Sequence, residues 1–190
     1  RMEFGPRALG ARSILADPRN KTMQKQLNLK IKFRESFRPF APAVLEKHCN
    51  NWFNFNGVSP YMLFVSNINE NKVTNKKTIK QSLSIINQKR SAIPGVTHVD
   101  YSARIQTVSK SFNDIFSRLI SEFYKLTKTP ILINTSFNIR GEPIVCSPAD
   151  AFRCFMGTKL DFLVIEDFVL DKKYQNKDLL KNYREEFNLD

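Results

Sequence analysis

The sequence predicts an α/β fold, and three observations favour it. Hydrophobic patterns typical of strands and of helices alternate along the 190 residues. The apolar run 130–133 is typical of a strand buried on both faces in a parallel sheet, and the polar segment 134–143 follows it at once. Residues 111–126 carry an apolar stripe at helical spacing. Ligands of open α/β sheets collect where strands end in loops, so we expect the functional site around residues 134–143.

The first part of the chain predicts one helix and several short strands. Residues 20–33 are expected to form a helix with Asn20 as the N-cap and three apolar residues on one face. Residues 67–90 are rich in Asn, Lys, Thr and Ser, which indicates a polar excursion from the core. Strand character is found at residues 41–45, 61–65, 97–99 and 105–108.

The second part predicts two helices and one further strand. The helix over 111–126 is expected to begin at Ser111, and its whole apolar stripe is expected in the core. A second helix is expected to begin at Ser147, with Pro148 in its first turn and Asp150 completing a capping box. Phe152, Phe155 and Met156 should then pack inward, residues 162–165 should form a buried strand, and residues 171–190 should form a charged helix or tail.

Composition sets the outer limits. With 42% hydrophobic residues the chain can form one core, and a single domain is the default expectation. The net charge of +12 favours anionic partners such as phosphates or nucleic acid. The three cysteines suggest neither a disulfide framework nor a zinc site, which favours a reducing, cytoplasmic environment. No apolar run reaches the roughly 18 residues of a membrane span.

Positive charge is concentrated near the N-terminus, where residues 1–40 hold ten Lys or Arg and three Asp or Glu. The basic side chains alternate with Gly, Pro and Phe, as in residues 4–7 and 32–40, which favours held cations over a solvated charge run. Arginine suits bidentate phosphate contacts and lysine adds a point charge. An ordinary basic surface is the alternative reading. Four further residues are expected to be structural. His98 should be bound by Asp100 or by backbone, Trp52 should pack, and Cys146 and Cys154 should lie in the core.

Six motifs in order resemble the C-terminal domain of the NodU/tobramycin-type O-carbamoyltransferases. They are RMEFGPRALG (1–10), RSILADPR (12–19), FRESFRPFAP (33–42), SPYML (59–63), THVD (97–100) and NTSFNIRGEPIV (134–145). The sequence departs from the family pattern at residues 69–90, which look like an insertion, and at Tyr101, where a small residue is expected. The chain opens inside a motif, so we expect it to be a piece of a longer protein.

The resemblance implies a YrdC-like domain over residues 1–170, a twisted open sheet flanked by helices with a concave basic surface. In that family this domain binds ATP, with Mg²⁺, and carbamoyl phosphate, and makes carbamoyladenylate. A metal-holding N-terminal domain of the ASKHA type then passes the carbamoyl group to an acceptor hydroxyl. No metal is expected in the present chain beyond the Mg²⁺ of ATP.

Carried over by motif, the implied catalytic residues are Lys32, Arg38 and Arg104. The implied substrate- and nucleotide-binding residues are Arg7, Asn134, Ser136 and Arg140. The cations suit the charge of phosphoryl groups, and the amide and hydroxyl suit neutral hydrogen bonds. An RNA-binding module that uses the basic surface is the main alternative, and a docking domain that needs a missing partner is another.

Overall fold

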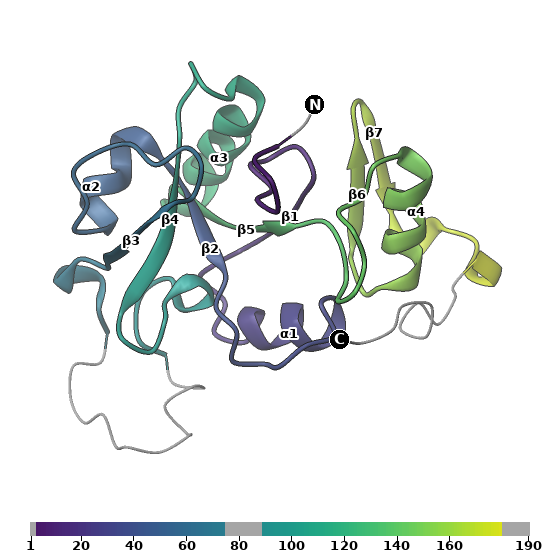
Figure 1. The fold of residues 1–190 in the computed structure, drawn as a ribbon, viewed down its shortest axis with the longest axis horizontal. Coiled ribbons are helices and arrows are strands. Elements are labelled where there is room, and N and C mark those ends of the chain that lie inside the picture. The colour runs from purple at the N-terminus through teal and green to yellow at the C-terminus, as the bar shows by residue number, and fades with distance from the viewer. Residues whose placement is uncertain (1–2, 75–88, 180–190) are drawn as a thin grey trace. The chain divides into compact units, whose positions relative to one another are not determined.

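The computed structural model describes residues 3–74 and 89–179 (Figure 1). The fold is mixed α/β, as the sequence predicts. The chain divides into two compact units. Unit 1 comprises residues 1–24 and 37–136, and unit 2 comprises residues 25–36 and 137–190.

Unit 1 contains a five-stranded mixed sheet in the order β1-β5-β2-β4-β3 (Figure 1). Only the β2 and β4 pair is parallel, and the other neighbours are antiparallel. The strands are β1 (Ser13–Ala16), β2 (Ala41–Leu45), β3 (Phe64–Asn67), β4 (Ser102–Val108) and β5 (Ile131–Ser136).

Of the four strands predicted between residues 41 and 108, two are confirmed and two are wrong. Residues 41–45 form β2 with the expected bounds, and residues 105–108 lie within the longer β4. The strand expected at 61–65 begins instead at Phe64, because Met62 adopts a left-handed backbone with φ 58°. Residues 97–99 form no strand. Thr97 is buried there, and its hydroxyl group donates to the Ile93 carbonyl at 2.8 Å.

The apolar run before the predicted site forms β5, but its surroundings differ from the expectation. β5 is antiparallel to both β1 and β2, so the parallel environment predicted for it is wrong. The strand also extends through Ser136, which places Asn134 and Ser136 inside the sheet instead of in a loop.

Helix α3 (Asp114–Thr127) packs on the sheet of unit 1. Phe116 and Ile120 are buried against side chains of β2, β4 and β5. The N-cap is Asn113, whose side chain accepts a hydrogen bond from the Phe116 amide, and not Ser111 as predicted. The expectation that the whole stripe is core is wrong, since Ile115, Leu119 and Leu126 are exposed. These three lie along one border of a stripe that is wider than the face the sheet covers.

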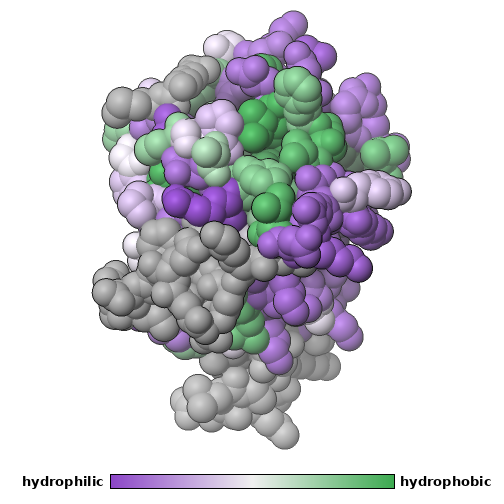
Figure 2. All heavy atoms as spheres, turned by 90° about the vertical axis from the view of Figure 1, so that its right-hand side faces the viewer, coloured by the Kyte–Doolittle hydropathy of each residue, from purple (hydrophilic) through white to green (hydrophobic). Residues whose placement is uncertain are grey.

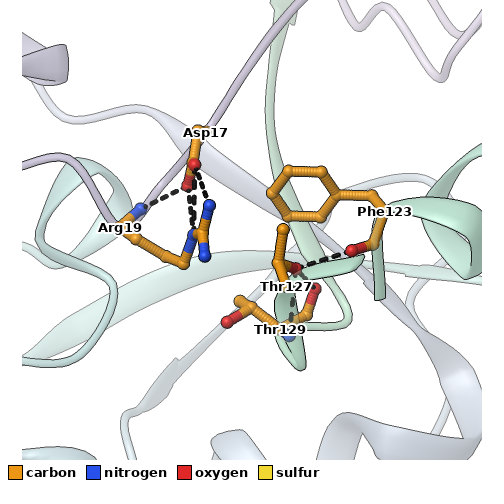
Figure 3. A network of polar contacts seen from close by, with 5 residues as sticks. All are labelled: Asp17, Arg19, Phe123, Thr127 and Thr129. Carbon is orange, nitrogen blue, oxygen red and sulfur yellow. Dashed lines mark hydrogen bonds and ion pairs between the residues drawn. The ribbon is translucent and has the colours of Figure 1, made fainter. Parts of the chain in front are cut away.

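A polar contact network supports the C-terminal end of α3 (Figure 3). Thr127 donates its hydroxyl to the Phe123 carbonyl at 2.6 Å and accepts the Thr129 amide at 3.2 Å. The guanidinium carbon of Arg19 lies 5.5 Å from the centre of the Phe123 ring, and its Nε donates to Asp17. The segment after β1 is thereby attached to the end of α3.

Pro42 occupies an unusual place in the central strand β2, because proline cannot donate to a sheet ladder. The Leu45 amide donates to the Pro130 carbonyl, on the β5 side. Amide directions alternate along a strand, so the donor that Pro42 lacks is on the β4 side. The parallel pairing of β2 with β4 begins only at Ala43, opposite Gln106.

Unit 1 also contains the short helix α2 (Cys49–Trp52), and helix α1 (Met23–Lys30) begins in unit 1 and continues in unit 2. The predicted helix over 20–33 is too long at both ends. Asn20 accepts the Thr22 amide in a turn before α1, and Phe33, with φ 48°, lies beyond its end. Trp52 is buried beneath Lys72, which confirms its packing role.

Unit 2 contains helix α4 (Pro148–Gly157) and the hairpin of β6 (Phe162–Ile165) and β7 (Phe168–Asp171). The capping box of Ser147 and Asp150 is confirmed, with Pro148 in the first turn. Phe155 and Met156 are buried, and Phe152 is half-buried. β6 lies where predicted but is not a buried strand, because Phe162 and Val164 are 58% and 63% exposed. A two-stranded hairpin covered by α4 on one side leaves its other face open.

Hydrophobic side chains also gather among hydrophilic ones in Figure 2, which views the molecule from the side where α4 and β7 lie in Figure 1.

The three cysteines are free thiols, and Cys146 is exposed, contrary to the prediction, while Cys154 is buried. Short 3₁₀ turns follow β7 at Lys172–Tyr174 and Lys177–Leu179. Most of the predicted insertion (residues 75–88) and the end of the tail (residues 180–190) lie outside the described residues. Within the described part, no helix has the length and apolar character needed to cross a membrane.

Candidate functional site

The sheet register of unit 1 brings several predicted residues to one end of the sheet. Ala41 lies opposite Asn134 on β5, and counting back from the pair Ala43 and Gln106 places Arg104 beside Ala41 on β4. Arg38 precedes β2 at this end, and Ser136 ends β5 there. Residues as far apart in the sequence as Arg38, Arg104 and Ser136 therefore lie at one end of the sheet.

Arg7 and Arg104 form a pair of neighbouring cations. Arg104 is exposed as a residue, but partial burial of its guanidinium group, and then the positive charge of Arg7, lower its pKa. Within residues 3–74 and 89–179, neither guanidinium group makes a hydrogen bond or an ion pair with a carboxylate. Two like charges side by side repel each other, so an anion bound between them would gain from both.

A polar network attaches the segment that carries Arg7 to the same face of the sheet. The side-chain amide of Asn134 donates to the Ala8 carbonyl at 2.9 Å and to Oε1 of Gln106 at 2.6 Å. Gln106 in turn donates to the Leu9 carbonyl at 3.1 Å. Both amide side chains are buried. Because they bind the carbonyls of Ala8 and Leu9, they fix the backbone next to Arg7.

The Oδ1 atom of Asn134 is buried and has no hydrogen-bond partner among the described residues. A buried unpaired acceptor is costly and calls for an explanation such as a ligand or a water molecule. Direct contact of Asn134 with a ligand stays a prediction.

Glu3 organises the same segment from its other side. Its carboxylate accepts the backbone amides of Leu9, Ala11 and Arg12 at 2.5, 2.9 and 3.1 Å. The Arg7 amide closes a turn by donating to the Phe4 carbonyl at 2.9 Å. A single carboxylate that gathers three amides makes this loop compact, and so limits the positions that Arg7 can adopt.

Gly10 lets this loop approach α3 closely. It has φ +118°, and a Cβ atom built there would lie 2.4 Å from the Phe116 ring. Sequence reasoning missed Gln106, Glu3 and Gly10 as supports of the site. Glu3 and Gly10 stand inside the first motif, but nothing in the local pattern marks Gln106, because its partners lie 28 and 97 residues away.

A cavity of about 320 Å³ opens at the same end of the sheet, where β2 and β4 are not paired. Residues 39–41, before and at the start of β2, line it together with Arg104, His98 and Asp100. The backbone there is held by Gln24, whose side chain donates to the carbonyls of Phe37 and Arg38 at 2.9 and 3.2 Å. Arg38 is exposed beside this segment.

His98 has the structural partner that the sequence predicts. Its Nδ1 lies 3.0 Å from Oδ1 of Asp100, which also accepts the amide and hydroxyl groups of Ser102. Burial raises the pKa of Asp100, but the hydrogen bonds from Ser102 and His98 outweigh it and lower that pKa to about 2. Asp100 is therefore an ionised anchor for the turn before β4. Tyr101 in this turn has φ 66°, a left-handed backbone conformation that is uncommon for a bulky side chain.

Lys32 and Arg140 belong to unit 2, whereas the other five predicted residues belong to unit 1. Lys32 is 4% exposed, and its Nζ donates to the carbonyl and to Oδ1 of Asn138, both at 2.8 Å. The Arg140 amide donates to the Lys32 carbonyl at 3.2 Å. The structure thus joins Lys32 to the loop that carries Arg140.

The chain resembles known proteins over its whole length. A family model described as carbamoyltransferase C-terminus matches residues 1–172. An uncharacterised protein of Synechocystis sp. is 52% identical over 100% of this chain and 32% of its own length. Nodulation protein NolNO of Sinorhizobium fredii is 44% identical over 91% of this chain and 23% of its own length. Nodulation protein NolO of Bradyrhizobium diazoefficiens is 43% identical over 91% of this chain and 29% of its own length.

These comparisons confirm the resemblance that the ordered motifs predicted, and they give no support to the RNA-binding alternative. The chain spans about a third or less of the curated relatives named above. It belongs to the family of carbamoyltransferase C-terminal domains.

Proposed function

We propose that this chain is the part of an O-carbamoyltransferase that binds ATP and carbamoyl phosphate and forms carbamoyladenylate. The observation that supports this proposal is the pair of Arg7 and Arg104, two neighbouring guanidinium groups without a carboxylate partner in the described residues. They lie at the sheet edge where the predicted Arg38, Asn134 and Ser136 also lie. Both substrates carry phosphate groups that such cations stabilise.

The proposed reaction balances with one water molecule. Hydrolysis of carbamoyl phosphate gives carbamate and inorganic phosphate. A carbamate oxygen then attacks the α-phosphorus of ATP, the bond to the bridging oxygen breaks, and pyrophosphate leaves with that electron pair. Phosphoryl chemistry of this kind depends on positioned positive charge more than on a protein nucleophile, which fits a site built from arginines. Mg²⁺ would enter on the oxygens of the triphosphate.

The remaining steps belong to the longer protein. We propose that an N-terminal ASKHA-type domain passes the carbamoyl group to an acceptor hydroxyl, since the chain spans only a third or less of its named relatives. The mixed five-stranded sheet supports the YrdC-like fold that the resemblance implies. Three free thiols support a reducing, cytoplasmic environment.

The test is product release from Mg-ATP by the 190-residue chain, with and without carbamoyl phosphate. We expect pyrophosphate and inorganic phosphate in equal amounts, and only when carbamoyl phosphate is present. Pyrophosphate at the same rate without carbamoyl phosphate would contradict the proposal. If neither product forms, calorimetric titration of the chain with Mg-ATP and with carbamoyl phosphate follows. Binding of neither substrate would contradict the proposal.

Arg104→Ala should reduce turnover or affinity about 10- to 100-fold, since a hydrogen bond to a charged group contributes roughly 1.5–3 kcal/mol. Arg104 is exposed, so its replacement should leave the fold intact. Arg118→Ala is the matched control, an exposed arginine on α3. Turnover and affinity of Arg104→Ala equal to those of the wild type would show that Arg104 does not bind the substrates.

A further inference from the structure

Unit 2 encloses a cluster of polar side chains that the proposed reaction has not yet used. Lys32, Glu142 and Cys154 are 4%, 7% and 0% exposed, and Asn138 lies between Lys32 and Glu142. Burying a lysine is costly unless its ammonium group is hydrogen-bonded. The Lys32 ammonium meets this need through two bonds to Asn138, one to its carbonyl and one to its side chain.

The orientation of the Asn138 side chain is fixed by Glu142. The Asn138 amide nitrogen donates to the Glu142 carbonyl at 2.7 Å, which leaves Oδ1 to face the ammonium group. The Glu142 carboxylate accepts the Ile139 amide at 2.8 Å and so closes the same loop on itself. Rotation of the Asn138 amide by 180° would place its nitrogen, a donor, against the Lys32 ammonium group and its oxygen, an acceptor, against the Glu142 carbonyl.

The charges around Lys32 oppose one another. Burial lowers its pKa to about 7, and the positive charge of Arg34 lowers it too, whereas the negative charge of Glu142 raises it. Arg34 is held in place by Asn28, whose Oδ1 accepts its Nε at 2.7 Å. Burial raises the pKa of Cys154, so the thiol is protonated near neutral pH and Glu142 supplies the stabilising negative charge.

We propose that Asn138 and Glu142 are positioning residues that hold the Lys32 ammonium group for a phosphate-bearing substrate. This inference rests on the proposed function and extends it to Lys32, which the family resemblance implies as a catalytic residue. The arrangement supports it in two ways. Both the backbone and the side chain of Lys32 are bound by residues 138–140, and the loop continues directly from Ser136 along the chain.

The experiment measures the dissociation constant of carbamoyl phosphate for the 190-residue chain between pH 6 and pH 9. Wild-type affinity should fall as pH rises through about 7, where Lys32 loses its proton. Glu142→Gln removes the negative charge and should move this midpoint down by about one pH unit. Asn138→Asp places a carboxylate beside the ammonium group and should move the midpoint up, even if the maximal affinity falls.

Glu166→Gln serves as the control, because Glu166 is an exposed carboxylate in the turn between β6 and β7. Circular dichroism checks that each variant is folded. Because each variant has its own expected direction of shift, either folded variant alone still tests the positioning role. Binding by the wild type with unmoved midpoints in the folded variants overturns the positioning role and leaves the proposed function standing. No binding by the wild type at any pH overturns the proposed function itself.

Discussion

Single residues of the candidate site divide into those that carry charge and those that hold the charge in place. Arg7 and Arg104 carry it, while Glu3, Gln106 and Asn134 fix the backbone beside Arg7. The sequence predicts both charged members through its resemblance to the family, and Arg7 stands inside the first motif. It predicts the supports poorly, because a buried glutamine gains its role only from partners that the fold brings near.

Lys32 should make the stability of the chain depend on pH. Its pKa is about 7 in the folded chain against an ordinary 10.5, so between these values the unfolded chain binds more protons. The free energy of unfolding should therefore rise with pH in this window, by at most about 1.4 kcal/mol per pH unit from this group. Below about pH 7 its contribution should be constant.

Urea titrations at pH 6, 7.5 and 9 check this. The rise should be smaller in Lys32→Met than in the wild type, because methionine has no proton to lose. Lys30→Met, on the exposed side of α1, should keep the wild-type slope. Equal slopes in Lys32→Met and the wild type would show that Lys32 titrates normally.

Among the elements, α3 shows what periodicity can and cannot predict. Seven apolar residues at helical spacing predict a helix, and the helix is there with bounds that differ by a few residues. The same stripe is too wide to be buried entirely against one sheet. The width of the covered face depends on where the sheet lies, and no local pattern contains that information.

Paired substitutions on α3 can measure the difference. Ile120→Ala should cost about 2–5 kcal/mol, because Ile120 is fully buried and its removal leaves a cavity. Leu126→Gln, at 86% exposure, should change the free energy of unfolding by less than about 0.5 kcal/mol. Thermal or urea unfolding of the two variants suffices. A large loss in Leu126→Gln would mean that this border of the helix is covered in solution.

The hairpin of β6 and β7 carries the same lesson for strands. The short apolar run 162–165 predicts a buried strand. Its position is right, but β6 has one partner strand and one covering helix. Burial on both faces would need a second layer that the described residues of unit 2 do not contain. Hydrophobicity alone cannot distinguish a strand inside a sheet from one in a hairpin with an open face.

At the scale of the whole molecule, the net charge of +12 invites nonspecific anions as well as substrates. Single-stranded RNA should bind at low salt and lose most of its affinity by about 0.2 M salt, since each neutralised phosphate adds to the salt dependence. Affinity for carbamoyl phosphate, a single small anion, should fall much less over the same range. Fluorescence anisotropy with a labelled oligonucleotide, beside calorimetry for carbamoyl phosphate, compares the two. RNA binding that persists at high salt would favour a nucleic-acid role.

The α/β class, most elements of the chain and the family were all predictable from the sequence. The ordered motifs from residue 1 to residue 145 predict the family. The capping box at Ser147 is predictable because its two partners are three residues apart in the sequence. The strand order was not predictable, because β1 and β5 are joined by pairings across more than 100 residues. Nor was the division into two units, since residues 25–36 leave one unit and join the other.

The cavity where β2 and β4 are not paired has a covalent cause, because Pro42 has no amide hydrogen to donate to β4. The donor that would continue the parallel ladder toward Ala41 and Arg104 does not exist, so β2 and β4 cannot close on each other there through that bond. Such an opening is preorganised. It needs no ligand to hold it apart, and a substrate that enters it does not have to spend binding energy on separating two strands.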